Sequence, residues 1–581
     1  MTALLYSAAA LLIVPPAVIL LHAIFWRPLR LRAFYTAQGV TGTPFRPLVG
    51  DLLALAKARA SLPFFEWFSP FDAAYGRLHY MFFGVDLRLR ILSPGLANEV
   101  LVTHARSFHK TELMRATLGR VMSAGLLLSE GEAHRRHRSM ISPAFTFARL
   151  QGMAPLIARA AARAVRGLTT RPRDAVVDAH EEMSNLTLYI IGRAAFGADF
   201  EGLLPPALAH GEEAAPPPRV AASAADAAGV HGKLAWLLDY MIKMVSSPLL
   251  LLPGGSLLPV ARTATALIGD LRALARGIIA ARRAARASEG ASAPPATTAA
   301  ADAAASAAAA AAADSDAANP VAPEEADNLL DHLLDAEDGG RGFTTEEVLD
   351  ESLTFVLAGH ETTAKALSWA LLLLAQHPVE LAALRGEAAA VLGGAGAAGS
   401  PPPRLPTRDD VASLPLLCAV LQEALRLYPP APLVARECVA GCTLRAAGEG
   451  PRGGDALRVA KGTTVVIPVA TLQRDPALWE EPEAFRPRRW LVAGGRFSAT
   501  ACLKHPLAFC AFSQGPRNCI GAGFALLEAR LILAVLVSRV GWELDASYRH
   551  LPGMAITLRP TYGLPMRFWA LHGAAAEEAA L

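Results

Sequence analysis

Hydrophobic side chains recur at three- and four-residue intervals in several long stretches of the chain, and this spacing predicts helices with a buried face. The clearest stretches cover residues 344–376, 416–427 and 522–540. Pro429 and Pro430 stop the second stretch, because proline lacks the backbone N–H that a continuing helix needs. The pattern therefore predicts at least three long helices in the globular body.

The beginning of the chain is uniformly apolar. Residues 4–26 carry no formal charge, and as a helix they would span about 34 Å, enough to cross a bilayer. A cleaved signal peptide would have a basic start and a shorter apolar stretch, and a buried soluble helix would be less uniform. Arg27, Arg30 and Arg32 follow at once, and basic residues of this kind stay on the cytosolic side. We predict one membrane anchor, with the rest of the chain in the cytosol, where thiols stay reduced.

Proline, glycine and alanine divide the remaining chain. Residues 27–50, which contain Pro44 and Pro47, are predicted to form a stiff linker into the globular body at residues 51–572. Within that body, residues 285–323 are mostly alanine, serine and aspartate. Alanine favours helix, but this stretch has no apolar face to bury, so we predict a solvated insertion.

Composition excludes several classes of protein. The chain has 581 residues, of which 53% are hydrophobic and 18% charged, so it is neither disordered nor short of core material. Its formal net charge of +3 gives no general electrostatic reason to bind nucleic acid. Its six cysteines include no CxxC pair, which argues against both a disulfide scaffold and a typical structural zinc site.

Gly394, Gly396 and Gly399 spell the GxGxxG signature of dinucleotide-binding loops. That signature works only between a strand and a helix, where backbone amides face a pyrophosphate. Here the preceding residues have a helical pattern, and three prolines from Pro401 onward forbid a helix start. We interpret the match as coincidence and predict that the chain does not itself bind NADPH.

One cysteine lies in a setting suited to chemistry. Cys519 sits on a turn between Gly515 and Gly521, directly before the apolar stretch 522–540. Amides of the turn, the N-terminal end of the next helix and the charge of Arg517 all favour a thiolate at this position. An inert buried cysteine would not need this cationic glycine frame. The thiolate is a candidate nucleophile, zinc ligand or iron ligand, and the residues alone leave these alternatives open.

The string from Phe512 to Gly521, FSQGPRNCIG, resembles the haem-binding loop FxxGxRxCxG of the cytochrome P450 family at every fixed position. The resemblance implies a mainly helical fold with small β-sheets, preceded here by one transmembrane helix, and haem b between two long helices. It also implies that Cys519 is the axial ligand of the haem iron, that Phe512 packs near it, and that Arg517 pairs with a haem propionate. Thiolate ligation favours cleavage of the O–O bond.

A glutamate and an arginine in the stretch 416–427 share one helix face. Glu423 and Arg426 are three residues apart and would form a weak ion pair if they were exposed. Their neighbours are apolar, so a buried pair satisfied by a third group is the better interpretation. The cytochrome P450 family has such an ExxR pair, joined by an arginine from a later segment. The resemblance gives that place to Arg489, with Arg488 where an acid is usual.

The longest predicted helix begins at a candidate capping box formed by Thr344 and Glu347. Gly359 lacks a Cβ and would let a ligand approach the backbone, and Thr362 can perturb the helical hydrogen bonds. An ordinary buried helix with its polar residues turned outward is the alternative. By resemblance, AGHETT is the oxygen-activation motif, in which Glu361 and Thr362 help to deliver protons to dioxygen.

Further basic residues match propionate-binding positions of the family. Arg138 fits one position, and His134, four residues earlier, stands where the family has tryptophan. Histidine still donates one N–H, so we expect retained haem binding with an altered propionate geometry. Arg436, in the string VARE, matches another such position. Arg135 and Arg136 form either a docking face for an acidic redox partner or an ordinary solvated face.

These inferences predict a membrane-anchored haem-thiolate monooxygenase of the eukaryotic microsomal type, in the endoplasmic reticulum with a cytosolic catalytic domain. It would insert one atom of O2 into a lipophilic substrate with electrons from NADPH, supplied by a partner NADPH–cytochrome P450 reductase. One alternative is a haem-thiolate isomerase or dehydratase that needs no O2, against which Glu361 and Thr362 argue. The other is a non-enzymatic haem-binding protein, such as a sensor or an electron carrier.

Overall fold

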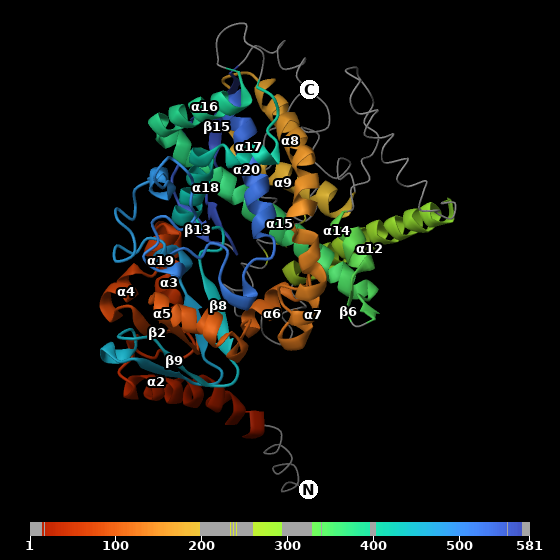
Figure 1. Cartoon of the computed structure of the whole chain (residues 1–581). Coiled ribbons are helices and arrows are strands. Elements are labelled where there is room, and N and C mark those ends of the chain that lie inside the picture. Colours follow the sequence, from red (N-terminus) through yellow and green to blue (C-terminus); the bar gives the residue numbers. More distant parts are fainter. Residues whose placement is uncertain are drawn as a thin grey trace.

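The computed structural model describes residues 14–197 except 17, residues 233, 236, 237 and 240, and residues 259–292, 328–394 except 339, and 403–571 except 555. Parts of three predicted features lie outside these residues: positions 4–13 and 17 of the anchor, 293–323 of the alanine-rich stretch, and Gly396 and Gly399 of the glycine motif. Figure 1 shows a helical body at the upper right and a strand-rich region beside the N-terminal helices at the lower left.

Helices make up most of the described chain, as the sequence pattern and the family resemblance predict. They are α2 (Arg27–Ala37), α3 (Leu52–Ser61), α4 (Ser69–Tyr75), α5 (Pro94–Asn98), α6 (Glu112–Leu118), α7 (Gly131–Ile141), α8 (Phe147–Thr169), α9 (Ala179–Phe196), α12 (Pro259–Ser292), α14 (Leu329–Asp335), α15 (Thr345–Gln376), α16 (Pro378–Leu392), α17 (Arg408–Ala412), α18 (Pro415–Leu427), α19 (Val469–Leu472) and α20 (Ala522–Arg539).

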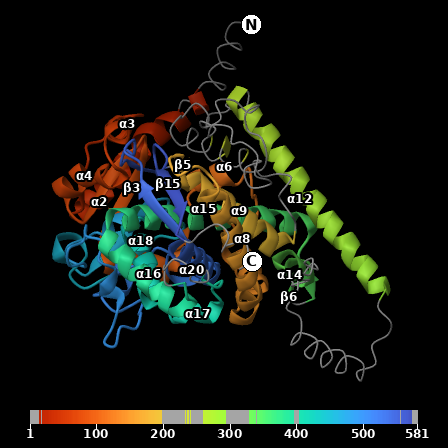
Figure 2. The ribbon, with the colours of Figure 1, turned by 90° about the horizontal axis from the view of Figure 1, so that it is seen from above.

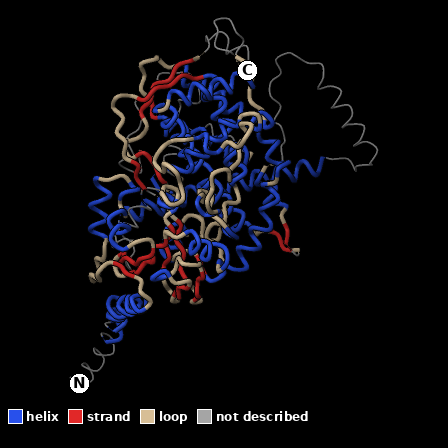
Figure 3. The backbone as a smooth tube through the Cα atoms, turned by 60° about the vertical axis from the view of Figure 1, so that its left-hand side comes forward, coloured by secondary structure: helices blue, strands red, loops and turns tan. Residues whose placement is uncertain are grey.

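The strands form small separate sheets, which Figure 3 shows in red in distinct regions of the molecule. The largest has the order β1-β2-β3-β11-β8-β4, and the others have the orders β10-β9, β12-β15-β5, β13-β14 and β6-β7. The strands are β1 (Thr41–Gly42), β2 (Leu78–Phe83), β3 (Asp86–Ile91), β4 (Phe108–His109), β5 (Val177–Asp178), β6 (Glu337–Asp338), β7 (Arg341–Gly342), β8 (Val434–Cys438), β9 (Cys442–Arg445), β10 (Ala456–Val459), β11 (Thr464–Ile467), β12 (Val540–Leu544), β13 (Pro552–Met554), β14 (Leu558–Pro560) and β15 (Pro565–Ala570).

Helices α15 and α20 form the centre of the helical body. Helix α9 packs along α15, and α8 packs along α20. All residues 348–355 of α15 and all residues 531–539 of α20 are buried. The buried run of α20 is almost entirely apolar, and each fully buried leucine in it contributes about 2 kcal/mol to folding. The buried run of α15 also contains Asp350 and Glu351, which are satisfied by Arg272 at 2.8 Å and His137 at 2.7 Å. This packing fixes the two helices that border the main cavity described below.

Local signals set the ends of these helices, as predicted. The Thr344 hydroxyl accepts a hydrogen bond from the Glu347 amide, and the Glu347 carboxylate accepts one from the Thr344 amide at 2.8 Å, which confirms the capping box. Helix α18 ends at Leu427, two residues before Pro429.

The described part of the N-terminus is helical and exposed. Val18, Ile19 and Leu20 are 57%, 68% and 60% exposed. Among the described residues, no single helix has both the length and the apolar character that a bilayer crossing requires. Within the described part of the chain, one bent pair, α15 and α16, meets these criteria when the two helices are taken together across their bend of 112°.

The predicted linker at residues 27–50 differs from expectation, because much of it belongs to the folded body. It contains α2 and β1, and β1 pairs in parallel with β2. Tyr35 of α2 is fully buried, and its hydroxyl donates a hydrogen bond to Thr463 Oγ1 at 2.8 Å. Arg27 donates to the carbonyl of Gly462 at 2.8 Å. Buried aromatic area and these bonds attach the segment to the region around β11.

The alanine-rich stretch begins as a helix, because α12 continues through residue 292, and the rest of the predicted insertion lies outside the described residues. Figure 2 shows α12 running along the outside of the body. Ion pairs attach the helix: Arg282 to Asp331 at 2.7 Å, and Arg272 to Asp350 at 2.8 Å. Alanine has the highest intrinsic helix propensity, so a helix held by ion pairs extends into the stretch without an apolar face to bury.

Candidate functional site

A cavity of about 660 Å³ lies among α15, α20, β8 and the loop before α20. Most of its lining is apolar, and none of the described residues that line it is acidic. Cys519 and Phe512 contribute to the lining from the loop, and Thr362 contributes from α15. The space suits a large apolar ligand, because such ligands bind in largely hydrophobic cavities that carry a few polar groups.

Backbone hydrogen bonds fold the loop that carries the cysteine. The Asn518 amide donates to the Gly515 carbonyl at 3.0 Å, and the Cys519 amide donates to the Phe512 carbonyl at 2.9 Å. Gly515 has a φ of +73°, and a Cβ there would lie 2.2 Å from the carbonyl oxygen of Leu101. Only glycine fits that position, because both the positive φ and the close approach of Leu101 exclude a side chain.

The protonation of Cys519 differs from expectation. Cys519 is exposed at the cavity surface, but the protein packed around its sulfur reduces solvation and raises the pKa of the thiol, and this outweighs the Gly521 amide and the charge of Arg138, which lower it. The neighbouring cation that acts on the sulfur is Arg138 and not Arg517. A neutral thiol is a poor nucleophile, whereas coordination to a metal ion removes its proton. Nowhere in the described chain do three or more His, Cys, Asp or Glu residues gather as a metal site, so zinc finds no support.

Helix α7 places two of the predicted residues beside this loop. Arg138 donates to the Asn518 carbonyl at 2.8 Å and to Asn518 Oδ1 at 2.6 Å, which ties the helix to the loop. His134 is buried. Burial, together with the charges of Arg517 and Arg138, lowers its pKa to about 4. The ring is therefore neutral at pH 7 and carries one N–H. One N–H is also what the tryptophan at this position of the family would donate.

Three basic side chains gather at the cavity wall: Lys110, Arg436 and Arg517. Burial and the neighbouring charge of Arg517 lower the pKa of Arg436 to about 10. Burial, Arg436 and Arg517 hold the pKa of Lys110 well below its usual value. Glu130 forms an ion pair with Arg517, but the Nη1 atom of Arg517 is buried without a hydrogen-bond partner among the described residues. Buried cations in excess of their partners fit an anionic ligand.

Lys110 was missed by sequence reasoning. It follows directly after β4, far from the other two cations in sequence, and a single lysine in a loop carries no signal of its own. Only the pairing of β4 with β8, which carries Arg436, brings the two together. Its main-chain amide donates to Glu130 at 2.6 Å, so Glu130 lies between the backbone of this loop and Arg517.

The structure separates the two residues of the predicted proton-delivery pair. Thr362 lines the cavity, and its hydroxyl donates to the Ala358 carbonyl at 2.8 Å. Glu361 is not among the described lining residues and instead pairs with Lys365. Burial alone would raise the pKa of Glu361, but the charge of Lys365 holds it below the usual value.

The missing Cβ of Gly359 serves helix packing and not ligand approach, which corrects the expectation from sequence. A Cβ at Gly359 would lie 3.2 Å from Ile191 of α9. The residue that lines the cavity one position earlier is Ala358. Glycine therefore lets α9 and α15 approach each other closely.

A second acid near α15 was also missed. Glu528 of α20 is completely buried, and burial raises its pKa to about 8, so the carboxyl is protonated at pH 7. Neither oxygen has a hydrogen-bond partner among the described residues within normal distance. The nearest hydroxyl that acts on it belongs to Thr363, which lines the cavity next to Thr362. In the sequence Glu528 stands within an apolar helix, and that contrast is the only available signal.

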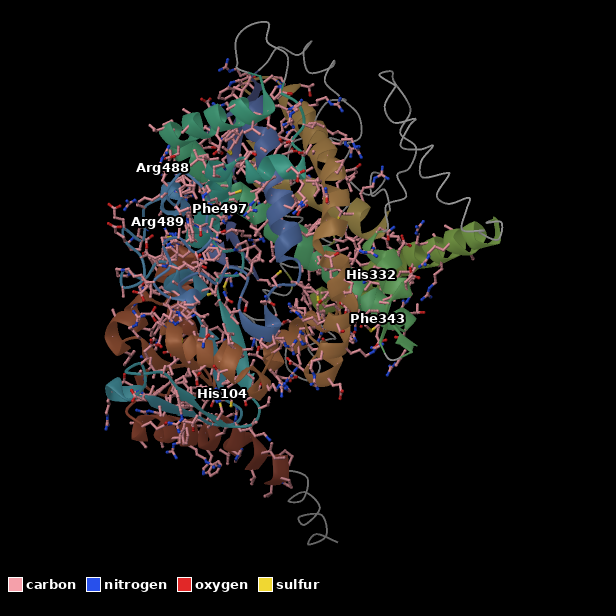
Figure 4. The ribbon with its side chains drawn as sticks, viewed as in Figure 1. His104, His332, Phe343, Arg488, Arg489 and Phe497 are labelled. Atoms are coloured by element: carbon pink, nitrogen blue, oxygen red, sulfur yellow. The ribbon has the colours of Figure 1, made fainter. Side chains whose placement is uncertain are left out.

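The predicted buried ion pair is present. Glu423 and Arg426 are both fully buried and share two hydrogen bonds, at 2.9 and 2.8 Å. Arg489 approaches Glu423 to 3.2 Å, and Trp490 Nε1 donates to it at 2.9 Å. Figure 4 shows Arg489 beside Arg488, and Arg488 pairs with Glu380 at 3.2 Å. The pair and its third arginine thus form one network, as the family resemblance implies.

Two further predictions concern surface features. Arg136 does not belong to a free basic face, because it binds Glu347 and the Gly342 carbonyl, each at 2.8 Å; Arg135 is exposed.

The glycine motif follows helix α16 and not a strand, so its described part lacks the setting of a dinucleotide-binding loop.

Comparison with known proteins agrees with this arrangement. The family described as "Cytochrome P450" matches residues 40–209 and 303–560. The chain is 28% identical to Cytochrome P450 734A4 of Oryza sativa subsp. japonica, over 98% of both chains. It is 30% identical to a cytokinin hydroxylase of Arabidopsis thaliana and 27% identical to Cytochrome P450 72A552 of Barbarea vulgaris, each over 93% of both chains. A thiol facing an apolar cavity with cations at its wall, on a chain matched along most of its length, identifies a monooxygenase of the cytochrome P450 family.

Proposed function

We propose that this enzyme inserts one atom of O2 into a lipophilic substrate, by hydroxylation or epoxidation. The observation that carries the proposal is that Cys519 and the Thr362 hydroxyl line the same apolar cavity. The cytokinin hydroxylase among the relatives supports hydroxylation as the reaction class. The test is a spectral binding screen of lipophilic compounds, followed by product analysis of the binders. A protein that binds none of them and forms no oxygenated product with its electron donors would contradict the proposal.

We propose that the cavity holds haem b. Cys519 would bind the iron, Phe512 would pack beside it, and Lys110, Arg436 and Arg517 would neutralise the propionates. The excess of buried cations and the unpartnered Arg517 Nη1 fit a dicarboxylate, and the Cys519 side chain, which lines the cavity, can supply a sulfur ligand to iron. When bound, thiolate-ligated haem supplies the activation of dioxygen. Arg138 would orient the loop that carries the cysteine, and His134 would offer a single N–H.

We propose that protons reach the cavity through Thr362. A general acid must lie within hydrogen-bond reach of the group that it protonates, directly or through one water. Thr362 meets this requirement for a molecule inside the cavity. Glu361 would act only after leaving its partners, whereas Glu528, protonated and next to Thr363, is a candidate proton donor behind the threonine pair.

Replacing Thr362 with alanine should uncouple oxygen consumption from product formation. Loss of a positioned proton donor or relay costs about 10²-fold or more in the assisted step, so we expect roughly ten-fold less product per O2 consumed. Parallel assays of O2, peroxide and product measure this ratio. Ser368→Ala is the matched control, because the Ser368 hydroxyl makes the same bond within α15, to Ala364 at 2.7 Å, outside the cavity lining. An unchanged ratio in Thr362→Ala would remove the relay role.

Replacing Lys110 with methionine should weaken haem retention. A hydrogen bond to a charged group contributes about 1.5–3 kcal/mol, which corresponds to roughly ten-fold to hundred-fold faster haem transfer to apomyoglobin. Lys110→Arg should keep most of the retention, because it keeps the charge. Lys461→Met is the matched control, because Lys461 is exposed and lies outside the cavity lining. Equal transfer rates for Lys110→Met and the wild type would place the propionates elsewhere.

We propose that electrons come from NADPH through a partner reductase and that residues 4–26 anchor the protein in the endoplasmic reticulum membrane, with the catalytic domain in the cytosol. The exposed apolar side chains at positions 18–21 support the anchor. Exposed Arg135 would belong to the reductase-docking face. Membrane fractionation of the full chain beside a form that begins at residue 27 tests the anchor.

The alternative reaction is isomerisation or dehydration without O2 or external electrons. The Thr362 hydroxyl in the cavity favours the monooxygenase, because those reactions need no proton delivery to dioxygen. Turnover assays with and without NADPH and reductase decide between them. Product formed at the full rate without reductant would favour the isomerase.

A further inference from the structure

Helix α15 carries a completely buried lysine that the reaction described above does not use. Lys365 is 1% exposed and stands one helical turn after Glu361. Burying an ammonium group is costly unless it is paired, and burial lowers the pKa of Lys365 while Glu361 opposes that effect. A lysine buried this deeply needs hydrogen-bond or ion-pair partners to compensate for its lost hydration. The partners of Lys365 lie on two different elements, so they indicate which elements the lysine connects.

The contacts of Lys365 cross from the helix to a neighbouring hairpin. Its Nζ atom contacts both the Glu361 carboxylate and the Thr557 hydroxyl. Thr557 Oγ1 also donates to Glu361 Oε1 at 2.9 Å, so the three groups form a closed triangle. Thr557 is 6% exposed and lies directly before β14, whereas the other two residues belong to α15. The triangle is thus a polar fastening between two elements that are far apart in sequence.

The fastened hairpin forms part of the cavity wall. Strands β13 and β14 pair through Met554 and Leu558, and Met554 and Ile556 line the cavity. The hairpin strand itself is held by two other hydrogen bonds: Trp369 Nε1 donates to the Leu558 carbonyl at 3.3 Å, and the Leu558 amide donates to the Pro430 carbonyl at 2.9 Å. These contacts hold the strand behind the wall, but Lys365 binds next to Ile556, at the part of the hairpin that faces the ligand space.

We propose that Lys365 is a positioning residue that sets the size of ligand the cavity accepts, by fastening the β13–β14 hairpin and its wall residues to α15. The inference rests on the proposed function only in treating this cavity as the substrate site above the haem. Without the fastening, the strand stays in place through Trp369 and Leu558, but the wall at Met554 and Ile556 gains room to retreat. Loss of Lys365 should therefore favour bulky ligands over small ones.

The test uses purified holoenzyme and two azole probes of different size, imidazole and clotrimazole, both detected by the shift of the Soret band when nitrogen binds iron. For Lys365→Met we expect the affinity ratio of clotrimazole to imidazole to rise about ten-fold, equivalent to 1.4 kcal/mol, with imidazole affinity nearly unchanged. Thr557→Val removes the hairpin side of the fastening and should shift the ratio in the same direction. Lys461→Met, an exposed lysine outside the lining, should leave the ratio unchanged.

The outcomes separate this inference from the proposed function. If wild-type protein binds neither azole, the haem site itself fails. If wild type binds both but the ratio stays within about two-fold of wild type in both variants, Lys365 has no positioning role. Equal weakening of both probes would indicate a purely structural lysine and would also overturn the proposal. Should Lys365→Met fail to accumulate, Thr557→Val, which keeps the Lys365–Glu361 pair, decides the question alone.

Discussion

Replacing Cys519 with alanine should abolish the red-shifted carbon monoxide band of the reduced protein and reduce turnover to background. The sulfur lines the cavity from the loop just before α20, and the described residues around it offer no cluster of metal ligands that could take its place. Without the sulfur, haem would be bound only by the cations at the cavity wall and by the apolar lining. Difference spectra of reduced protein with carbon monoxide, recorded at equal protein concentration, measure the effect.

A control separates the ligand from the general loss of a thiol. Cys502 is partly buried and lies outside the cavity lining, so Cys502→Ala should keep the full band. Cys519→Ser tests whether oxygen can replace sulfur, and we expect a band without the red shift or none at all. A Cys519→Ala protein with an unaltered band would mean that another group binds the iron.

Replacing Arg426 with methionine should strongly destabilise the fold. Arg426 is fully buried, binds Glu423 twice, and donates to the carbonyls of Gln473, Pro482 and Ala484 at 2.8, 2.6 and 3.0 Å. Breaking a buried pair from one side costs about 3–5 kcal/mol, because the other charge stays buried. That loss is a large part of the stability of an ordinary domain, about 5–15 kcal/mol.

The measurement is the thermal midpoint together with haem content after expression, since these remain defined when unfolding is not two-state. Arg488→Met is the matched control: Arg488 lies in the same segment, but its side chain is 59% exposed, and the expected loss is within about 0.5 kcal/mol. Glu423→Gln combined with Arg426→Met should cost less than the sum of the two single changes. A midpoint for Arg426→Met equal to that of Arg488→Met would remove the network from the framework of the fold.

Local sequence signals predicted the elements that frame the cavity. The Thr344–Glu347 capping box begins α15, and the apolar run after Cys519 forms α20. The burial of Glu423 and Arg426 also followed from sequence, because two opposite charges on one face of an otherwise apolar helix have no solvated side to occupy. Each of these inferences depends on residues within a few positions of one another.

Two contacts between residues that are distant in sequence were not predicted. Lys110 meets Arg436 only through the pairing of β4 with β8, and Glu528 meets Thr363 only through the packing of α20 on α15. The protonation of Cys519 was predicted from its flanking residues alone, but the pKa is dominated by the reduced solvation of the sulfur, which three-dimensional packing decides.

The placement of Glu361 had a local signal that sequence reasoning did not use. Lys365 follows it by four residues, the spacing at which opposite charges pair along a helix. The hairpin partner, Thr557, lies nearly two hundred positions later in the chain, and nothing near Glu361 in sequence points to it. The ion pair of Glu361 with Lys365 could therefore be predicted from their spacing in sequence, whereas their contact with Thr557 could not.

The central claim is that Cys519 binds the iron of a haem in this cavity. X-ray absorption at the iron edge of purified ferric protein tests it most directly, because the fine structure counts the atoms bound to iron by element. We expect one sulfur atom bound to iron beside the porphyrin nitrogens in the wild type, and none in Cys519→Ala protein reconstituted with haem. Iron bound only by nitrogen or oxygen in the wild type would contradict it.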